Sequence, residues 1–261
     1  MNIRTALVWI VGSLLIIPGA VYKGVRSFLS HDFSPSYICR IVQTGPQREA
    51  LQTSYLAELM QLSADRPVTF DQFDAVLAQK RLQLSPVVKE VKMKVIKPDT
   101  VYVDYTVRQP VASLYDFENV ALDEEGIPFP IMPFFSPKKL PEIYLGIQAL
   151  AWGRPLQHDQ LEKALTYLKM MQDLSLHVKR LDMTQAKLPS LGRREIVVIL
   201  EENGFSKYLR LTPRNFAQEI GNYLELRSTL PLESQVIDLR IPRLAFIDNK
   251  MKVHNSQSLG N

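Results

Sequence analysis

Residues 85–115 read SPVVKEVKMKVIKPDTVYVDYTVRQPVASLY, and no other part of the chain says as much about its fold. Apolar residues alternate with charged or polar ones over residues 91–95 and again over residues 101–108. A period of two places one side of a strand on a core and the other side in water. Between the two runs, Pro98 and Asp99 favour a turn, because proline has φ already fixed and aspartate can bond to nearby backbone. We therefore predict a hairpin of two half-buried antiparallel strands.

One strand and two helices are expected before this hairpin. Residues 37–43 predict a strand, and residues 51–62 carry apolar side chains at helical spacing. Thr69 and Gln72 have the spacing of a capping box, which predicts the start of a second helix. The core-facing residues expected on that helix are Phe70, Phe73, Val76 and Leu77. The predicted order for residues 37–110 is β-α-α-β-β.

A second, larger unit is expected over residues 111–250. Thr212-Pro213 is a typical helix start, since proline is favoured at the first helical position. The full expectation is strands at 112–117 and 119–123, an extended proline-rich loop at 127–141, a helix on residues 161–171, strands at 176–183, 195–201 and 206–212, a helix from Thr212, and a final strand at 235–247. The polar end of the chain, residues 251–261, is expected to be a disordered tail.

The N-terminal region reads as a membrane span. Residues 5–22 contain no charged side chain, and a helix of this length would measure about 27 Å, close to the hydrocarbon thickness of a bilayer. A cleaved signal peptide competes with this interpretation, but the apolar stretch is longer than a typical signal core. We therefore predict a short cytoplasmic tail at 1–4, a retained transmembrane helix at 5–22 and a linker at 23–36.

Composition and motifs argue against an enzyme. The net charge of +4 comes from 31 basic and 27 acidic residues that are spread along the chain, which does not favour a nucleic-acid groove. The single cysteine, Cys39, excludes an intramolecular disulfide and a multi-cysteine metal site. The four histidines are far apart, and the common nucleotide, hydrolase and zinc motifs are missing. We expect no catalytic residues, cofactor, metal, nucleic acid or small-molecule substrate.

Several short motifs, in a consistent order, resemble those of the FtsQ/DivIB family of bacterial cell-division proteins. The hairpin ends in a phrase typical of that family, and three further motifs follow in the second unit. They are Arg108-Gln109-Pro110-Val111-Ala112, then Ala121-Leu122-Asp123 with Gly126 and Phe129, then Leu140-Pro141-Glu142-Ile143 with Gly146, and finally Val236-Ile237-Asp238-Leu239-Arg240. The resemblance covers nearly the whole chain.

The resemblance implies an α+β fold with a single N-terminal transmembrane helix, a small β-α-α-β-β POTRA domain and a larger mixed β domain with two helices. It also implies a non-enzymatic scaffold of the divisome that binds FtsB/DivIC-like and FtsL-like partners and helps control septal peptidoglycan synthesis. Such a protein would sit in the bacterial cytoplasmic membrane at the division septum, with a cytoplasmic N-terminus and its bulk outside the cytoplasm. The alternative is a POTRA-containing factor for outer-membrane protein transport or assembly.

A free strand edge is the feature of such a chain that best suits binding, because its unpaired N–H and C=O groups can accept a strand from a partner. The last expected strand is the best candidate, and the family's partner docks on this part of the β domain. Ile237, Leu239 and Ile241 are expected on one face of this strand. The predicted partner-binding residues are Val236, Ile237, Asp238, Leu239, Arg240, Ile241, Leu244 and Phe246.

Overall fold

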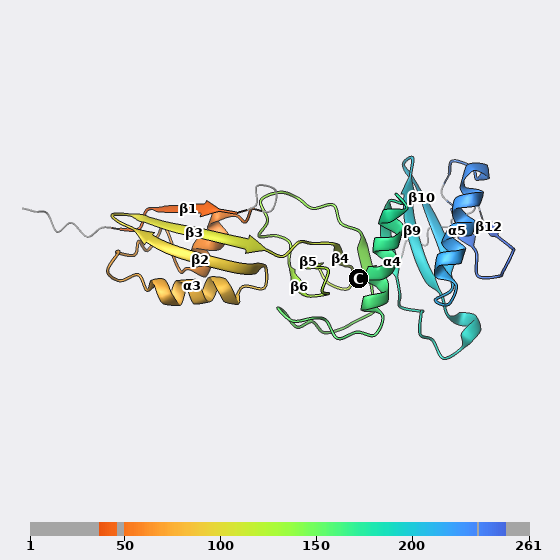
Figure 1. The fold of residues 1–261 in the computed structure, drawn as a ribbon, viewed down its shortest axis with the longest axis horizontal. Coiled ribbons are helices and arrows are strands. Elements are labelled where there is room, and N and C mark those ends of the chain that lie inside the picture. Colours follow the sequence, from red (N-terminus) through yellow and green to blue (C-terminus); the bar gives the residue numbers. More distant parts are fainter. Residues whose placement is uncertain (1–36, 46–49, 234, 249–261) are drawn as a thin grey trace, which may run out of the picture.

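The computed structural model describes residues 37–45, 50–233 and 235–248. They form an elongated molecule with a three-stranded sheet at one end and a nine-stranded mixed sheet at the other (Figure 1). The elements of the first part are β1 (Arg40–Thr44), α2 (Thr53–Leu59), α3 (Ala75–Leu84), β2 (Val88–Ile96) and β3 (Thr100–Val107). Those of the second are β4 (Ala112–Leu114), β5 (Val120–Leu122), β6 (Pro128–Pro130), β7 (Glu142–Tyr144), α4 (Leu161–Asp173), β8 (Val178–Asp182), β9 (Ile196–Glu202), β10 (Phe205–Leu211), α5 (Phe216–Leu226), β11 (Gln235–Asp238) and β12 (Phe246–Asp248), with short 3-10 turns at Leu191–Arg193 and Arg227–Thr229.

The predicted hairpin is confirmed. β2 and β3 pair antiparallel, with Lys92 opposite Asp104 and Met93 opposite Val103, and β1 pairs parallel with β3 on its other side. The sheet order is β1-β3-β2. The alternate residues of β3 are buried in a core with α2 and α3, as the period of two requires: Val101, Val103, Tyr105 and Val107.

The start expected for the second helix is wrong. Its first residue is Ala75, because the Asp74 carboxylate caps it by accepting from the Leu77 N–H at 2.9 Å. Thr69 instead forms an isolated antiparallel β-bridge with Tyr37, and a turn over residues 70–72 follows it. The face of α3 that reaches the core carries Ala78 and Leu82. Val76 and Leu77, both expected in the core, are exposed.

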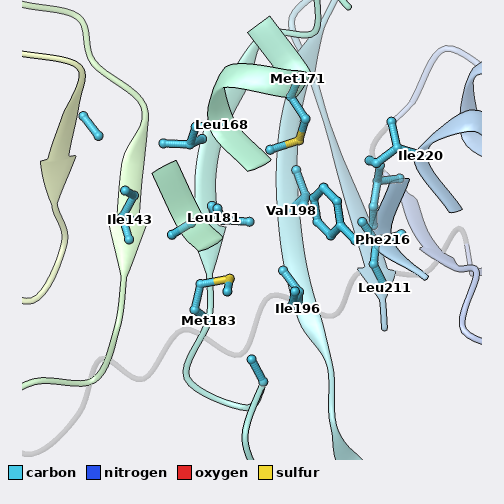
Figure 2. Close-up of a cluster of buried hydrophobic side chains, with 14 of the residues drawn as sticks. Ile143, Leu168, Met171, Leu181, Met183, Ile196, Val198, Leu211, Phe216 and Ile220 are labelled. Atoms are coloured by element: carbon cyan, nitrogen blue, oxygen red, sulfur yellow. The ribbon is translucent and has the colours of Figure 1, made fainter. Parts of the chain in front are cut away.

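One face of the nine-stranded sheet is covered by α4 and α5. Leu168 and Met171 of α4, with Phe216 and Ile220 of α5, pack against Val198 and its neighbours on the sheet (Figure 2). The Tyr167 and Phe216 rings stack with 3.9 Å between centroids, which joins the two helices. The strand order is β12-β11-β10-β9-β8-β7-β4-β5-β6.

The junction between the two units is held by residues of the first two family-like motifs. Arg108 donates to the Asp123 carboxylate at 2.9 Å and to the Pro86 carbonyl at 3.0 Å. The other Asp123 oxygen accepts from the N–H groups of Glu125 and Ile127, which fixes the turn after β5. These motif residues therefore have an architectural role in this chain.

The predicted fold class, with its transmembrane helix, is wrong for the part of the chain that the structure describes. No helix there is long and apolar enough to cross a membrane. The longest, α4, has 13 residues, or about 20 Å, and carries charged side chains on its outer face. What these residues form is an α+β fold with four α-helices and a large mixed sheet. The span expected at 5–22, the tail at 1–4, the linker at 23–36 and the tail at 251–261 lie outside the described residues.

The prediction of one long final strand is also wrong. Residues 235–247 form two strands, β11 and β12, that pair antiparallel. The Asp238 carboxylate accepts from the Arg240 N–H at 3.1 Å, and Arg243 has a positive φ of 65°. Because Pro242 has no N–H to donate, the chain turns back here rather than continuing. The region expected as an extended loop likewise contains β6, which is only three residues long.

Candidate partner-binding edge

The edge of the nine-stranded sheet is β12, not β11. β11 lies inside the sheet, parallel to β10 on one side and antiparallel to β12 on the other. Among the described residues, β12 has a paired neighbour on one side only, and it lies at the end of the molecule far from the three-stranded sheet (Figure 1). The open edge is therefore formed by the residues after the turn.

The eight predicted partner-binding residues fall into three groups. Ile237 and Leu239 are buried in the core beneath α5, and Val236 is half-buried in β11. Asp238 and Arg240 pair with each other. The remaining three are exposed on the turn and on β12: Ile241, Leu244 and Phe246. Only this third group can meet a partner without disturbing the core.

An ion-pair network holds the turn between β11 and β12. The Arg240 guanidinium lies 2.7 Å from one Asp238 oxygen and 3.1 Å from Glu195. Arg210 on the neighbouring strand bridges to the same two acids, at 3.3 Å from Asp238 and 2.7 Å from Glu195. Burial acts to raise the pKa of Asp238, but the hydrogen bonds from Arg240 outweigh it and hold that pKa below its ordinary value. These paired charges tie the turn to the sheet.

Backbone alternation shows which groups of β12 are free. The Leu239 N–H donates to Arg210 of β10 at 3.0 Å, so alternate residues of β11 point their backbone groups the other way, toward β12. Since Asp238 lies opposite Phe246 and Val236 opposite Asp248, those pairs exchange the hydrogen bonds. The N–H and C=O of Ile247 must then point away from the sheet. Ile247 offers a donor and an acceptor to an incoming strand.

A groove runs beside this edge, between α5 and the turn. It has a volume of about 350 Å³, and its apolar lining comes from Leu226, Leu239, Pro242, Leu244 and Ala245. Gln218 and Asn222 of α5 line the opposite wall. A partner that adds a strand to β12 could place the next part of its chain in this groove.

Glu219 fixes the start of α5, which forms one wall of the groove. Its carboxylate accepts from the Thr212 N–H and from the Thr212 hydroxyl, both at 2.6 Å. Burial raises the pKa of Glu219 above its ordinary value. Both oxygens are used within the protein, so Glu219 acts as a structural residue here.

Two parts of this edge carry no recognisable signal in the sequence. The α5 residues of the groove, Gln218 and Asn222, look like ordinary surface residues of an amphipathic helix. Ile247 is the last residue of the predicted strand, and its role depends on the direction of its backbone groups rather than on its side chain. Only the position of the turn identifies it.

Metal-binding residues do not gather at this edge. Over the described residues, no group of three or more His, Cys, Asp or Glu side chains is placed to hold a metal ion. His177 is far from His158 in the sequence, and His31 and His254 lie outside the described part. The expectations of no cofactor and no catalytic residue stay predictions.

Comparisons with known proteins do not assign the chain to a family. No protein-family model matches the chain. No curated protein matches it either. Function must therefore be inferred from the geometry of the β12 edge and from the sequence motifs.

Proposed function

We propose that the chain is a non-enzymatic scaffold of bacterial cell division, which binds FtsB/DivIC-like and FtsL-like partners at the β12 edge. The observation that carries the proposal is an open strand edge with exposed apolar side chains beside a groove. The resemblance to the FtsQ/DivIB family supports the choice of partners. Through them the protein would help control septal peptidoglycan synthesis, on the outer side of the cytoplasmic membrane at the septum.

Strand addition accounts for binding without a preformed deep pocket. A partner strand would bond to the outward N–H and C=O of Ile247, and main-chain bonds of this kind provide affinity with little dependence on sequence. Specificity would come from the side chains around the edge. Phe246 is 55% exposed and Ile247 is 46% exposed, so both have apolar surface to bury against a partner.

The turn residues extend this apolar surface. Ile241 and Leu244 are exposed, and they lie on the connection between the groove and β12. The ion pairs of Asp238 and Arg240 hold this connection in one conformation, which lowers the entropy cost of binding. The predicted residues Asp238 and Arg240 would thus support binding without direct contact, and the buried Ile237 and Leu239 would support the strand from below.

The test is a binding titration of the full chain with an FtsB-like partner. Phe246→Asp should weaken binding at least about tenfold, since it places a charge where an apolar contact is expected. Phe135→Asp is the matched control, because Phe135 is also an exposed phenylalanine, at 77%, but lies far from this edge. Equal loss of binding in both variants, or no loss in either, would rule out the β12 edge as the docking site.

A further inference from the structure

A second pocket, which shares only Asn215 with the lining of the β12 groove, lies where α4 and α5 begin. It has a volume of about 400 Å³, within the usual range of small-molecule sites. The Tyr167 hydroxyl, in the middle of α4, donates to the Pro213 carbonyl just before α5 at 3.3 Å. Its lining is polar and basic: Gln160, Lys163, Lys187, Arg194, Thr212, Arg214 and Asn215, with Ala186 and Pro213.

The charge of this pocket is strongly positive. Four cations line it, and no acidic side chain of the described chain does. Lys187 pairs with Asp159 just outside the pocket, and Arg194 donates to the Leu188 carbonyl at 2.5 Å. Among the described residues, Lys163 and Arg214 have no ion-pair partner. At least two positive charges are therefore free to meet an anion.

Both helices point their N-termini at this pocket. Gln160 and Asn215 occupy the positions just before the first helical residues, and neither caps its helix with a side-chain hydrogen bond. The first turns of the helices therefore keep N–H groups that no side chain satisfies. The partial positive charge at each helix start favours anions, and it is partly offset by the acidic residue in each first turn, Glu162 in α4 and Glu219 in α5.

Gln160 is the most informative residue of the pocket. Only 4% of its surface is exposed, and it lines the pocket. Within the described part of the chain, its side-chain amide has no hydrogen-bond partner, although its backbone N–H donates to His158. A ligand in the pocket would give this amide a hydrogen-bond partner within the complex.

We propose that this pocket binds a phosphate group. The donors come from several sides: the two helix starts, the Lys163 ammonium and the Arg214 guanidinium. A tetrahedral phosphate presents oxygens in all of these directions, whereas a planar carboxylate presents only two oxygens, both in one plane. Arginine forks and helix N-termini are the groups that bind phosphate most effectively in proteins. The site is independent of the β12 edge and of the partners proposed for it.

The test is calorimetric titration of the full chain with inorganic phosphate and with pyrophosphate, at constant ionic strength. Lys163→Gln and Arg214→Gln should each weaken binding about tenfold, because each removes a charge-assisted hydrogen bond. Lys169→Gln is the matched control: it removes an exposed lysine from the same helix, α4, but at a different groove. It should leave the affinity unchanged.

Two further titrations identify the source of the phosphate. Phosphatidylcholine vesicles that contain phosphatidic acid test a lipid headgroup, with pure phosphatidylcholine vesicles as the reference. Binding to soluble phosphate, or to the acidic vesicles alone, supports the site if Arg214→Gln weakens it about tenfold. Three results would overturn the proposal: no binding to any of these probes, equal loss in the Lys169→Gln control, or acetate binding as tight as that of phosphate.

Discussion

The two edges of the nine-stranded sheet, β6 and β12, have the same length but opposite properties. β6 reads Pro-Phe-Pro, its Phe129 is fully buried, and it lies between the two sheets (Figure 1). β12 reads Phe-Ile-Asp, and all three of its residues are exposed at the far end of the molecule. The contrast shows how this chain closes one edge of its sheet and leaves the other open.

Backbone direction explains how the β6 edge is closed. The Ile131 N–H donates to Asn119 and the Asp123 N–H to Ile127, so residues 127, 129 and 131 face β5. Pro128 and Pro130 are left facing outward, and proline has no N–H to offer a further strand. The chain after β6 also crosses to the first unit, where Phe135 donates to the Ala50 carbonyl at 2.8 Å. Strand addition is therefore blocked at β6, whereas the outward-facing residue of β12, Ile247, keeps its N–H.

The largest expected difference between the edges is in stability. Phe129→Ala should lower the free energy of unfolding by about 3–5 kcal/mol, since it leaves a cavity beside Phe134 in the core. Phe246→Ala makes the same change at the open edge and should cost less than about 1 kcal/mol. Urea denaturation of both variants measures the two effects. Similar losses would mean that β12 is packed rather than free.

A proline at Ile247 should close the open edge in the way that the prolines close β6. Ile247→Pro removes the outward N–H, and we expect partner binding to fall roughly 30-fold, through the lost hydrogen bond and the poorer fit of the incoming strand. The fold should survive, because that N–H points away from β11. A thermal melt checks the fold, and a binding titration checks the affinity. Unchanged affinity in a folded variant would contradict strand addition.

The ion pairs at the β11–β12 turn should make the open edge sensitive to acid. The folded-state pKa of Asp238 is lowered from its ordinary value of 3.8. Its ion pairs therefore stabilise the fold fully above pH 3.8, and this stabilisation is lost as the pH falls through the lowered pKa. Asp238→Asn should cost about 1–3 kcal/mol at pH 7. The difference in free energy of unfolding between this variant and the natural chain should become smaller below about pH 4. Denaturant curves at several pH values measure it, and a gap that does not change with pH would be evidence against the ion pair.

The smallest effect is expected from opening the closed edge. Pro130→Val restores an outward N–H at β6, but the segment that follows still joins the first unit. Partner affinity should stay within about twofold of that of the natural chain, because docking is expected at β12 alone. A clear gain in affinity, measured by the same titration, would show that β6 is a second docking edge.

Much of the first unit could be predicted from the sequence. The hairpin follows directly from the alternation around Met93 and Val103, since strict alternation of apolar and polar residues is typical of a strand with one buried face. The start of α3 could not be predicted so well, because Thr69 and Asp74 both have capping side chains and only packing chooses between them. That error of a few residues was enough to place the exposed Val76 in the expected core.

The sequence places the candidate site at the last expected strand, but it does not give the geometry of that region. The alternation of Ile237 and Leu239 correctly indicates burial, but it continues through Ile241 without showing the turn at Asp238. Which strand forms an edge depends on sheet order, and sheet order depends on contacts between distant segments such as β10 and β11. Local patterns do not contain that information.

The most direct measurement is amide hydrogen exchange, resolved by residue, with and without an FtsB-like partner. The central claim is that a partner strand bonds to Ile247 of β12. We predict that the Ile247 N–H exchanges rapidly in the free chain and is protected on binding, whereas Phe246 and Asp248, already bonded to β11, change little. A saturating partner that leaves Ile247 unprotected would contradict the claim.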